Sequence, residues 1–206
     1  MRITSPAVPN IPLATVSYEQ RYTDQTNNVF RLYFNQLSSA LRTLFGTNGA
    51  AYLDSPCASY YTTTTQTAAA INTAYPIVMD PPVIEKGIFL GTPASRIYVE
   101  NAGIYNFQFS LQLAKSNASV GNIWIWYRVN GVDAAYSASR VAVQGTNAQT
   151  IAAWNFVVEM QVGDYFELMW AVDDVHVQII AYPTTAFAPA IPPVIMTVTF
   201  VSAITT

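Results

Sequence analysis

The sequence predicts a mainly β protein, an antiparallel sandwich or barrel preceded by a proline-rich arm and one amphipathic helix. Three observations carry this prediction. Short β-type segments, separated by turn signals about every ten residues, fill residues 94–206. Residues 105–113, YNFQFSLQL, alternate strictly between apolar and polar side chains, as a half-buried strand does. Apolar residues recur at three- and four-residue steps between residues 17 and 45, which indicates one helix.

The first 16 residues are rich in proline, with Pro6, Pro9 and Pro12. Proline lacks a backbone N–H donor and fixes its own φ angle, so residues 1–16 should form an extended arm and not a helix. We expect such an arm either to lack order or to become ordered by docking on another surface.

Residues 17–46 contain the predicted helix. Ser17 and Gln20 have the spacing of a capping box, and Gly46 is placed to end the helix. The apolar face is wide and aromatic, which suits packing on another surface better than a narrow two-stranded coiled-coil seam. It either folds onto the chain's own β region or contacts symmetry mates or a larger object. In the second case the expected contact residues are Tyr22, Phe30, Tyr33, Phe34, Leu37 and Leu41.

Residues 47–93 are expected to be an irregular connecting segment, with Thr62–Thr65 as an edge or surface strand. The dense strand series then occupies residues 94–206, and Asn130-Gly131 is its strongest short hairpin signal. The expected strands lie at 95–100, 104–114, 122–129, 134–143, 150–160, 164–172, 175–182 and 194–202.

The strand NIWIWYRV (122–129) is apolar on both faces. A half-exposed antiparallel strand should alternate, so this segment predicts a second covering layer, which a neighbouring subunit would supply. Trp124 and Trp126 are the contact residues expected in that layer. Their rings could instead line a sugar site, but their alternation within a strand favours core or subunit packing.

The composition favours self-association. The 206 residues are 51% hydrophobic and only 10% charged, whereas soluble chains usually carry about 25% charged residues. A surface with so little charge is expected to be covered, and an obligate interface between copies is the simplest cover. A surface built from Asn, Gln, Ser and Thr is the alternative, and both can hold together.

Charge and sequence pattern exclude several classes of protein. Nine Lys and Arg residues and a net charge of −3 argue against a nucleic-acid partner, which needs a clustered basic patch. A single cysteine, Cys57, cannot form an intrachain disulfide. The apolar stretch 186–204 is interrupted by prolines in its first half and is β-branched afterwards, so we expect a core strand and no membrane span. The start of the chain has no signal-peptide pattern, which predicts assembly in the cytoplasm.

Few residues have the pattern of catalytic or metal chemistry. His176 is the single histidine, with no second histidine or cysteine at ligand spacing, so a zinc site is not expected. Asp173 and Asp174 stand together in a turn, where they could bind calcium or act as a glycosidase pair, although a solvated turn is the simpler interpretation. The phosphate-loop, dinucleotide and metalloprotease motifs are missing from the sequence. We therefore expect no cofactor and no enzymatic activity.

Several motifs follow one another in the order found in a known family. They are Gly103, Tyr105 and Phe107 in a G-x-Y-x-F strand, Asn130-Gly131 in a turn, Gly163-Asp164 before an alternating strand, and Ala186-Phe187 before the last strand. Over residues 94–206 the chain resembles the TNF-like jelly rolls, which include the globular heads of complement. The resemblance implies a ten-stranded sandwich that packs as a compact trimer with aromatic residues along its threefold axis. Tyr105 and Phe107 are then either core residues or axis contacts.

A second resemblance concerns the helix. Residues 22–41, YTDQTNNVFRLYFNQLSSAL, are similar to segments that precede such β domains in tailed-phage virion proteins. Together the two resemblances imply a homotrimeric virion protein of a bacteriophage, assembled in the host cytoplasm, whose N-terminal region binds the major capsid protein or another virion protein. A capsid decoration or cement protein is the first expectation. The alternative is a tail fibre or receptor-binding head that recognises a host surface glycan.

Overall fold

The computed structural model describes residues 7–13, 16–45 and 55–204. It divides the chain into two compact units, Met1–Asp54 and Ser55–Thr206. The β unit therefore begins well before residue 94, where the sequence pattern had placed its start. This correction follows from a strand at Cys57–Thr62, which contributes the fully buried Tyr60 to the core.

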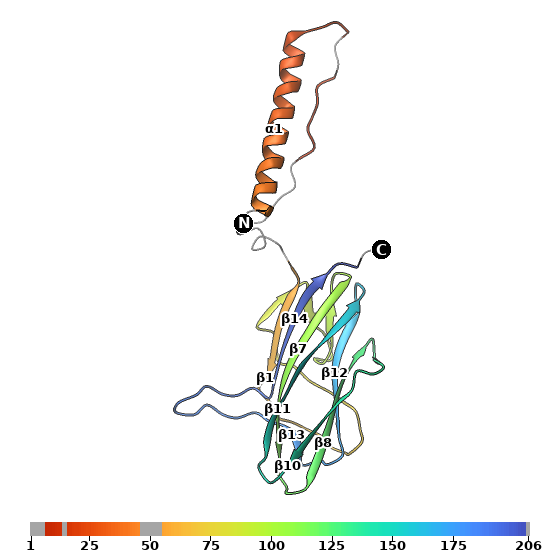
Figure 1. Cartoon of the computed structure of the whole chain (residues 1–206), viewed down its shortest axis with the longest axis vertical. Helices are drawn as coiled ribbons and strands as arrows, with labels where there is room; N and C mark the ends of the chain where they lie inside the picture. The colour runs from red at the N-terminus through yellow and green to blue at the C-terminus, as the bar shows by residue number, and fades with distance from the viewer. Residues whose placement is uncertain (1–6, 14–15, 46–54, 205–206) are drawn as a thin grey trace. The chain divides into compact units, whose positions relative to one another are not determined.

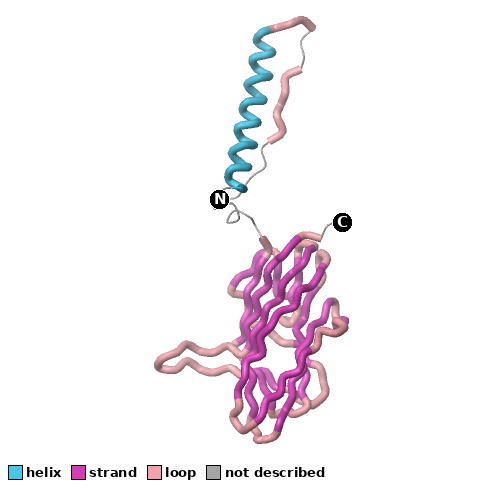
Figure 2. Tube along the Cα trace, in the orientation of Figure 1, coloured by secondary structure: helices cyan, strands magenta, loops and turns pink. Residues whose placement is uncertain are grey.

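In the described residues of the N-terminal unit, an extended stretch is followed by one helix. Residues 7–13 have no regular secondary structure, as predicted for a proline-rich arm, and in Figure 2 they run in the direction opposite to the helix. Helix α1 spans Gln20–Phe45. Its first turn is closed by the Thr23 N–H, which donates to the Glu19 carbonyl at 3.2 Å. Ser17 therefore precedes the helix, which begins three residues later than the sequence predicts; Gly46 lies outside the described residues.

The β unit is a sandwich of two antiparallel sheets (Figure 1). The first sheet has the order β2-β13-β7-β14-β1-β4, and β11 also pairs with β7. Its strands are β1 (Cys57–Thr62), β2 (Gln66–Thr67), β4 (Ile84–Lys86), β7 (Gly103–Lys115), β11 (Gln149–Met160), β13 (Val177–Ile179) and β14 (Val194–Ser202).

The second sheet has the order β10-β8-β12-β6-β5. Two short strands extend it, since β3 pairs with β12 and β9 pairs with β8. Its strands are β3 (Tyr75–Pro76), β5 (Ile88–Leu90), β6 (Ile97–Val99), β8 (Val120–Val129), β9 (Val132–Asp133), β10 (Ser139–Gln144) and β12 (Tyr165–Val172). The predicted fold class, an antiparallel jelly-roll sandwich with one preceding helix, is confirmed.

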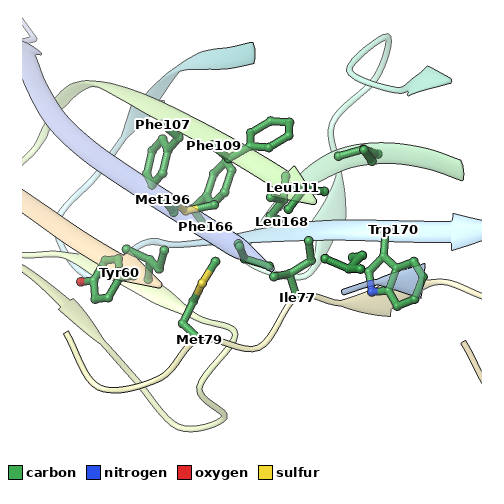
Figure 3. Close-up of a cluster of buried hydrophobic side chains, with 14 of the residues drawn as sticks. Tyr60, Ile77, Met79, Phe107, Phe109, Leu111, Phe166, Leu168, Trp170 and Met196 are labelled. Carbon is green, nitrogen blue, oxygen red and sulfur yellow. The ribbon is translucent and has the colours of Figure 1, made fainter. Parts of the chain in front are cut away.

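The core lies between the two sheets (Figure 3). Alternate residues of β7 point into it, because successive side chains of a strand face opposite sides of the sheet. Tyr105 and Phe107 are each 0% exposed, and Phe166 of β12 stacks on Phe107 from the second sheet. The strict alternation of residues 105–113 therefore corresponds to one buried and one outward face, as predicted.

Two predicted strands differ from the structure. The segment 134–143 forms a strand only from Ser139, because Ala134–Ser137 make a turn in which Tyr136 has a φ of 59°. Thr62–Thr65 is not a strand of its own; Thr62 ends β1, and the next strand begins at Gln66. Because β1 pairs with both β14 and β4, it lies inside the sheet and not at its edge.

The C-terminal apolar stretch forms a central strand, as predicted. β14 lies between β7 and β1, and its Val194, Met196 and Val198 are fully buried. Within the residues that the structure describes, no helix has the length and apolarity needed to cross a membrane.

Candidate interaction surfaces

The helix carries two adjacent apolar stripes. One is half-buried within the N-terminal unit and consists of Tyr22, Thr26, Val29, Tyr33, Ala40 and Leu44. The second, which we call the exposed stripe, consists of the exposed Phe30, Phe34 and Leu41 and the half-buried Leu37 between them. Phe34 is 59% exposed, although its ring makes an edge contact with Tyr33 at 5.6 Å between centroids. The predicted wide aromatic face is present, and its outer half is open for a contact beyond the N-terminal unit.

The second candidate surface is the outward face of the first sheet, which we call the neutral face. It is formed by the residues of β1, β7, β11 and β14 that point away from the core. Strand register aligns them in rows: Tyr61, Ile195, Ser110 and Ala153 form one, and Cys57, Thr199, Asn106 and Val157 form another. Within these four strands Lys115 points into the core, so Glu159 is their single charged residue on the neutral face.

Aliphatic side chains on the neutral face are exposed in the single chain. Val157 and Ile151 are each about 60% exposed, and Ile195 is more than 40% exposed. Amides and hydroxyls lie between them, and one pair is already joined, since the Asn155 amide donates to the Asn106 side-chain oxygen at 2.8 Å. A face with almost no charge and several exposed aliphatic residues has the composition of an interface core.

Two predicted contact residues are not on any surface. Tyr105 and Phe107 point into the sandwich, and the Tyr105 hydroxyl donates to the Asn101 carbonyl at 2.7 Å. They are core residues, so their proposed role as contact residues is corrected. The residues of β7 that can meet a partner are their outward neighbours, such as Asn106 and Gln108.

Trp124 and Trp126 lie on the outward face of the second sheet, where each is half-buried. The Trp126 indole N–H donates to Asp133 at 2.5 Å, and Arg128 Nε donates to the same carboxylate oxygen. These donors hold the pKa of Asp133 below its usual range. The hairpin of β8 and β9 in the same chain therefore covers part of the surface that a neighbouring subunit was expected to cover.

A long excursion separates β13 from β14 and stands away from the sandwich in Figure 1. Its base is closed by a bridge between Tyr182 and Ile191, and its tip by a turn in which Thr185 N–H donates to the Ala188 carbonyl. Phe187, at the tip, is 91% exposed. The sequence motif Ala186-Phe187 therefore lies in a projecting hairpin that precedes the last strand, β14.

The acidic pair has its partners within the chain. Asp174 accepts hydrogen bonds from Lys115, whose side chain is completely buried, and from Ser119 at 2.9 Å. Its other oxygen accepts from the backbone N–H of His176 at 3.0 Å and contacts the imidazole. Lys115 and these further donors hold the pKa of Asp174 far below its usual range. Asp173 is engaged by Asn122, whose backbone and side-chain N–H groups both donate to it at 2.6 Å.

This arrangement does not fit the catalytic alternatives. A glycosidase needs one protonated carboxylic acid near neutral pH, whereas Asp174 is held ionised by the ammonium group of Lys115. In a nucleophile triad the serine bonds the histidine, but Ser119 bonds Asp174. Over residues 7–13, 16–45 and 55–204, no group of three or more His, Cys, Asp and Glu side chains is placed to hold a metal ion.

Comparison with known proteins identifies the fold of the β unit. No family model matches the sequence, and no curated protein matches it. Among solved structures, the chain is similar to Eiger TNF from S. frugiperda, with 8% identity and a TM-score of 0.50 over 75% of this chain and 97% of that one. It is also similar to murine APRIL at pH 8.0, with 10% identity and a TM-score of 0.46 over 71% of this chain and 99% of that one. The likeness to Eiger TNF shows a TNF-like jelly-roll fold.

Sequence reasoning missed the neutral face as a site. The signal was nevertheless present, because the residues between the apolar members of 105–113 are Asn, Gln and Ser, with no charge among them. What the sequence lacked was the register that places Val157 opposite Asn106 and Ile195 opposite Ser110.

Proposed function

We propose that this chain is a homotrimeric virion structural protein that decorates and cements a capsid. The neutral face carries the proposal. It exposes Val157, Ile151 and Ile195 on four strands (β1, β7, β11 and β14) that carry a single outward charge, which suits burial against another copy of the chain. The resemblance to TNF-like jelly rolls implies a trimer, and the TNF-like fold supports that arrangement.

The N-terminal unit would attach the trimer to the shell. Its exposed stripe offers Phe30, Phe34 and Leu41 for burial, and apolar burial contributes about 25 cal/mol per Å². Three copies of the stripe on one trimer would bind a symmetric surface together, which multiplies a modest single affinity. The function is then binding alone, with capsid stabilisation as its result.

The attachment is tested by removing residues 1–45 and measuring how much protein remains on purified capsids, together with the capsids' resistance to heat. We expect occupancy and heat resistance both to fall. A sharper version replaces Phe30, Phe34 and Leu41 with serine. Its matched control replaces the exposed polar residues Asn35 and Gln36 of the same helix with serine and should leave occupancy unchanged. Full occupancy by the stripe variant would contradict the anchoring role.

A further inference from the structure

A small pocket opens on the first sheet at the end of β7. It has a volume of about 230 Å³. The residues that line it are Ala114, Lys115, Ser116, Asn147, Gln149, Gln178, Ile180 and Tyr182. Register explains its shape, because Ala114 pairs with Gln149 on one side and with Gln178 on the other. A methyl group between two long amide side chains leaves a hollow between them.

The backbone of the walls is held in place by hydrogen bonds. Asn147 N–H donates to the Lys115 carbonyl at 2.9 Å, and Lys115 N–H donates to the Ala148 carbonyl at 3.0 Å. Asn147 adopts a φ of 61°, a conformation that asparagine tolerates better than most residues. Ser116 N–H donates to the His176 carbonyl at 3.1 Å, and Tyr182 N–H to the Ile191 carbonyl at 3.1 Å. The pocket is thus preformed by paired backbone.

The uncharged polar side chains that line the pocket are free to hydrogen-bond a ligand. The structure gives no hydrogen bond within the described chain to the amides of Asn147, Gln149 and Gln178 or to the hydroxyl of Tyr182. The one charged residue, Lys115, is neutralised by Asp174. The pocket therefore presents donors and acceptors without a net charge, beside the ring of Tyr182 and the side chain of Ile180.

We propose that this pocket binds one neutral sugar ring of a glycan. Sugar hydroxyls both donate and accept hydrogen bonds, and side-chain amides offer both functions. The apolar face of a pyranose ring suits Tyr182 and Ile180. A volume of about 230 Å³ lies below the roughly 300–1,000 Å³ of pockets for drug-sized ligands, which matches one ring.

The alternatives fit less well. A charged ligand would find no opposite charge, because the Lys115 ammonium group is buried and paired with Asp174. An extended peptide is recognised by unpaired backbone groups at a sheet edge, whereas Lys115, Asn147 and Tyr182 already use their N–H groups within the chain.

The test is saturation-transfer NMR on the full chain with glucose, galactose, mannose and N-acetylglucosamine, alongside glucuronic acid and a polyglycine peptide. We expect at least one neutral sugar to bind with a Kd in the millimolar range, because the ligand is so small. Ala114→Leu fills the hollow and should abolish the signal, and Gln149→Ala should weaken binding about tenfold or more. The matched control is Gln108→Ala, which removes an exposed amide from the side of β7 that also carries Ala114.

The proposal is overturned if none of the four neutral sugars binds, if only the acid or the peptide binds, or if Ala114→Leu binds as well as the unaltered chain. Gln149 is exposed at the start of β11, so its variant keeps the test valid if Ala114→Leu fails to fold. The pocket lies at one end of the neutral face, to which Ala114 and Gln149 belong, but its lining is complete in a single chain. A Val157→Arg chain that is monomeric and still binds sugar would separate the two claims.

Discussion

The rings of Phe107 and Phe166 stack face to face across the sandwich, with centroids 3.9 Å apart and planes inclined by 8°. Phe107 belongs to β7 of the first sheet and Phe166 to β12 of the second, so the contact joins the two layers. Tyr127 stacks on Phe166 as well, at 5.5 Å between centroids. This aromatic group fixes how the sheets face each other and thus which residues of β7 point outward.

Replacing Phe107 with alanine should destabilise the β unit by about 3–5 kcal/mol, because it removes a fully buried ring and leaves a cavity between the sheets. Urea unfolding measures the change, and trimer yield should fall with it. Gln108→Ala, the outward neighbour, should stay within about 0.5 kcal/mol of the unaltered chain. Equal stability of the Phe107→Ala chain would contradict the assigned faces.

Asp174→Asn should destabilise the fold by about 3 kcal/mol or more near neutral pH, since it leaves the buried ammonium group of Lys115 without its counter-charge. Lys115→Met should cost much less, because Asp174 keeps Ser119 and His176 as partners. Urea unfolding measures the loss of stability in each of the two variants. Equal losses in the two variants would contradict a buried, compensated charge.

The pH dependence of stability follows from the lowered pKa of Asp174. Folding lowers that pKa from 3.8, so the contribution of Asp174 to stability is complete above about pH 5 and is lost progressively as the pH falls below that value. The stability difference between the unaltered chain and Asp174→Asn should therefore be constant from pH 7 to about pH 5 and shrink in acid. A difference that stays constant down to pH 2 would argue against this assignment.

Asn130 and Asp164 should be energetically coupled. The Asn130 amide donates to Asp164 at 2.7 Å, and the Asn130 oxygen accepts from the backbone N–H of Tyr165 at 3.1 Å. A double-mutant cycle with Asn130→Ala and Asp164→Ala should give a coupling of about 1 kcal/mol, and the strain of replacing a residue with a φ of 52° cancels in the cycle. Asp80→Ala, on another part of the chain, should show no coupling to Asn130.

Val157→Arg should prevent self-association, because it places a charge on the neutral face. Light scattering on the unaltered chain should give about 68 kDa, three times 22.6 kDa, and the variant should give the monomer mass. Val132→Arg is the matched control, since Val132 is 71% exposed but lies in β9 of the second sheet. A trimeric Val157→Arg chain would exclude the neutral face as the interface.

The strands of residues 94–206 could be predicted because their alternation and turns are local properties of the sequence. Asn130-Gly131 is such a turn, and both residues have positive φ angles, 52° and 79°. β1 could not be predicted in the same way, since CASYYT is short and polar at several positions and becomes a strand through its pairing with β14 and β4. The start of the β unit was misplaced for the same reason.

The candidate sites depend on contacts distant in sequence. The position of Lys115 in the alternating series indicates that it points inward, but its partner Asp174 is 59 residues away and could not be identified. Likewise, the pocket requires Gln149 and Gln178 to flank Ala114, which only the pairing of three strands establishes. The helix stripes followed directly from three- and four-residue spacing, which is local.

Electron cryo-microscopy of intact particles that contain this chain tests the central claim most directly, because it gives both the position and the copy number. The proposed decoration role predicts density for three copies of the chain at each occupied site on the outer surface of the capsid shell. Density confined to the tail, or particles whose shell carries no copy of the chain, would contradict it.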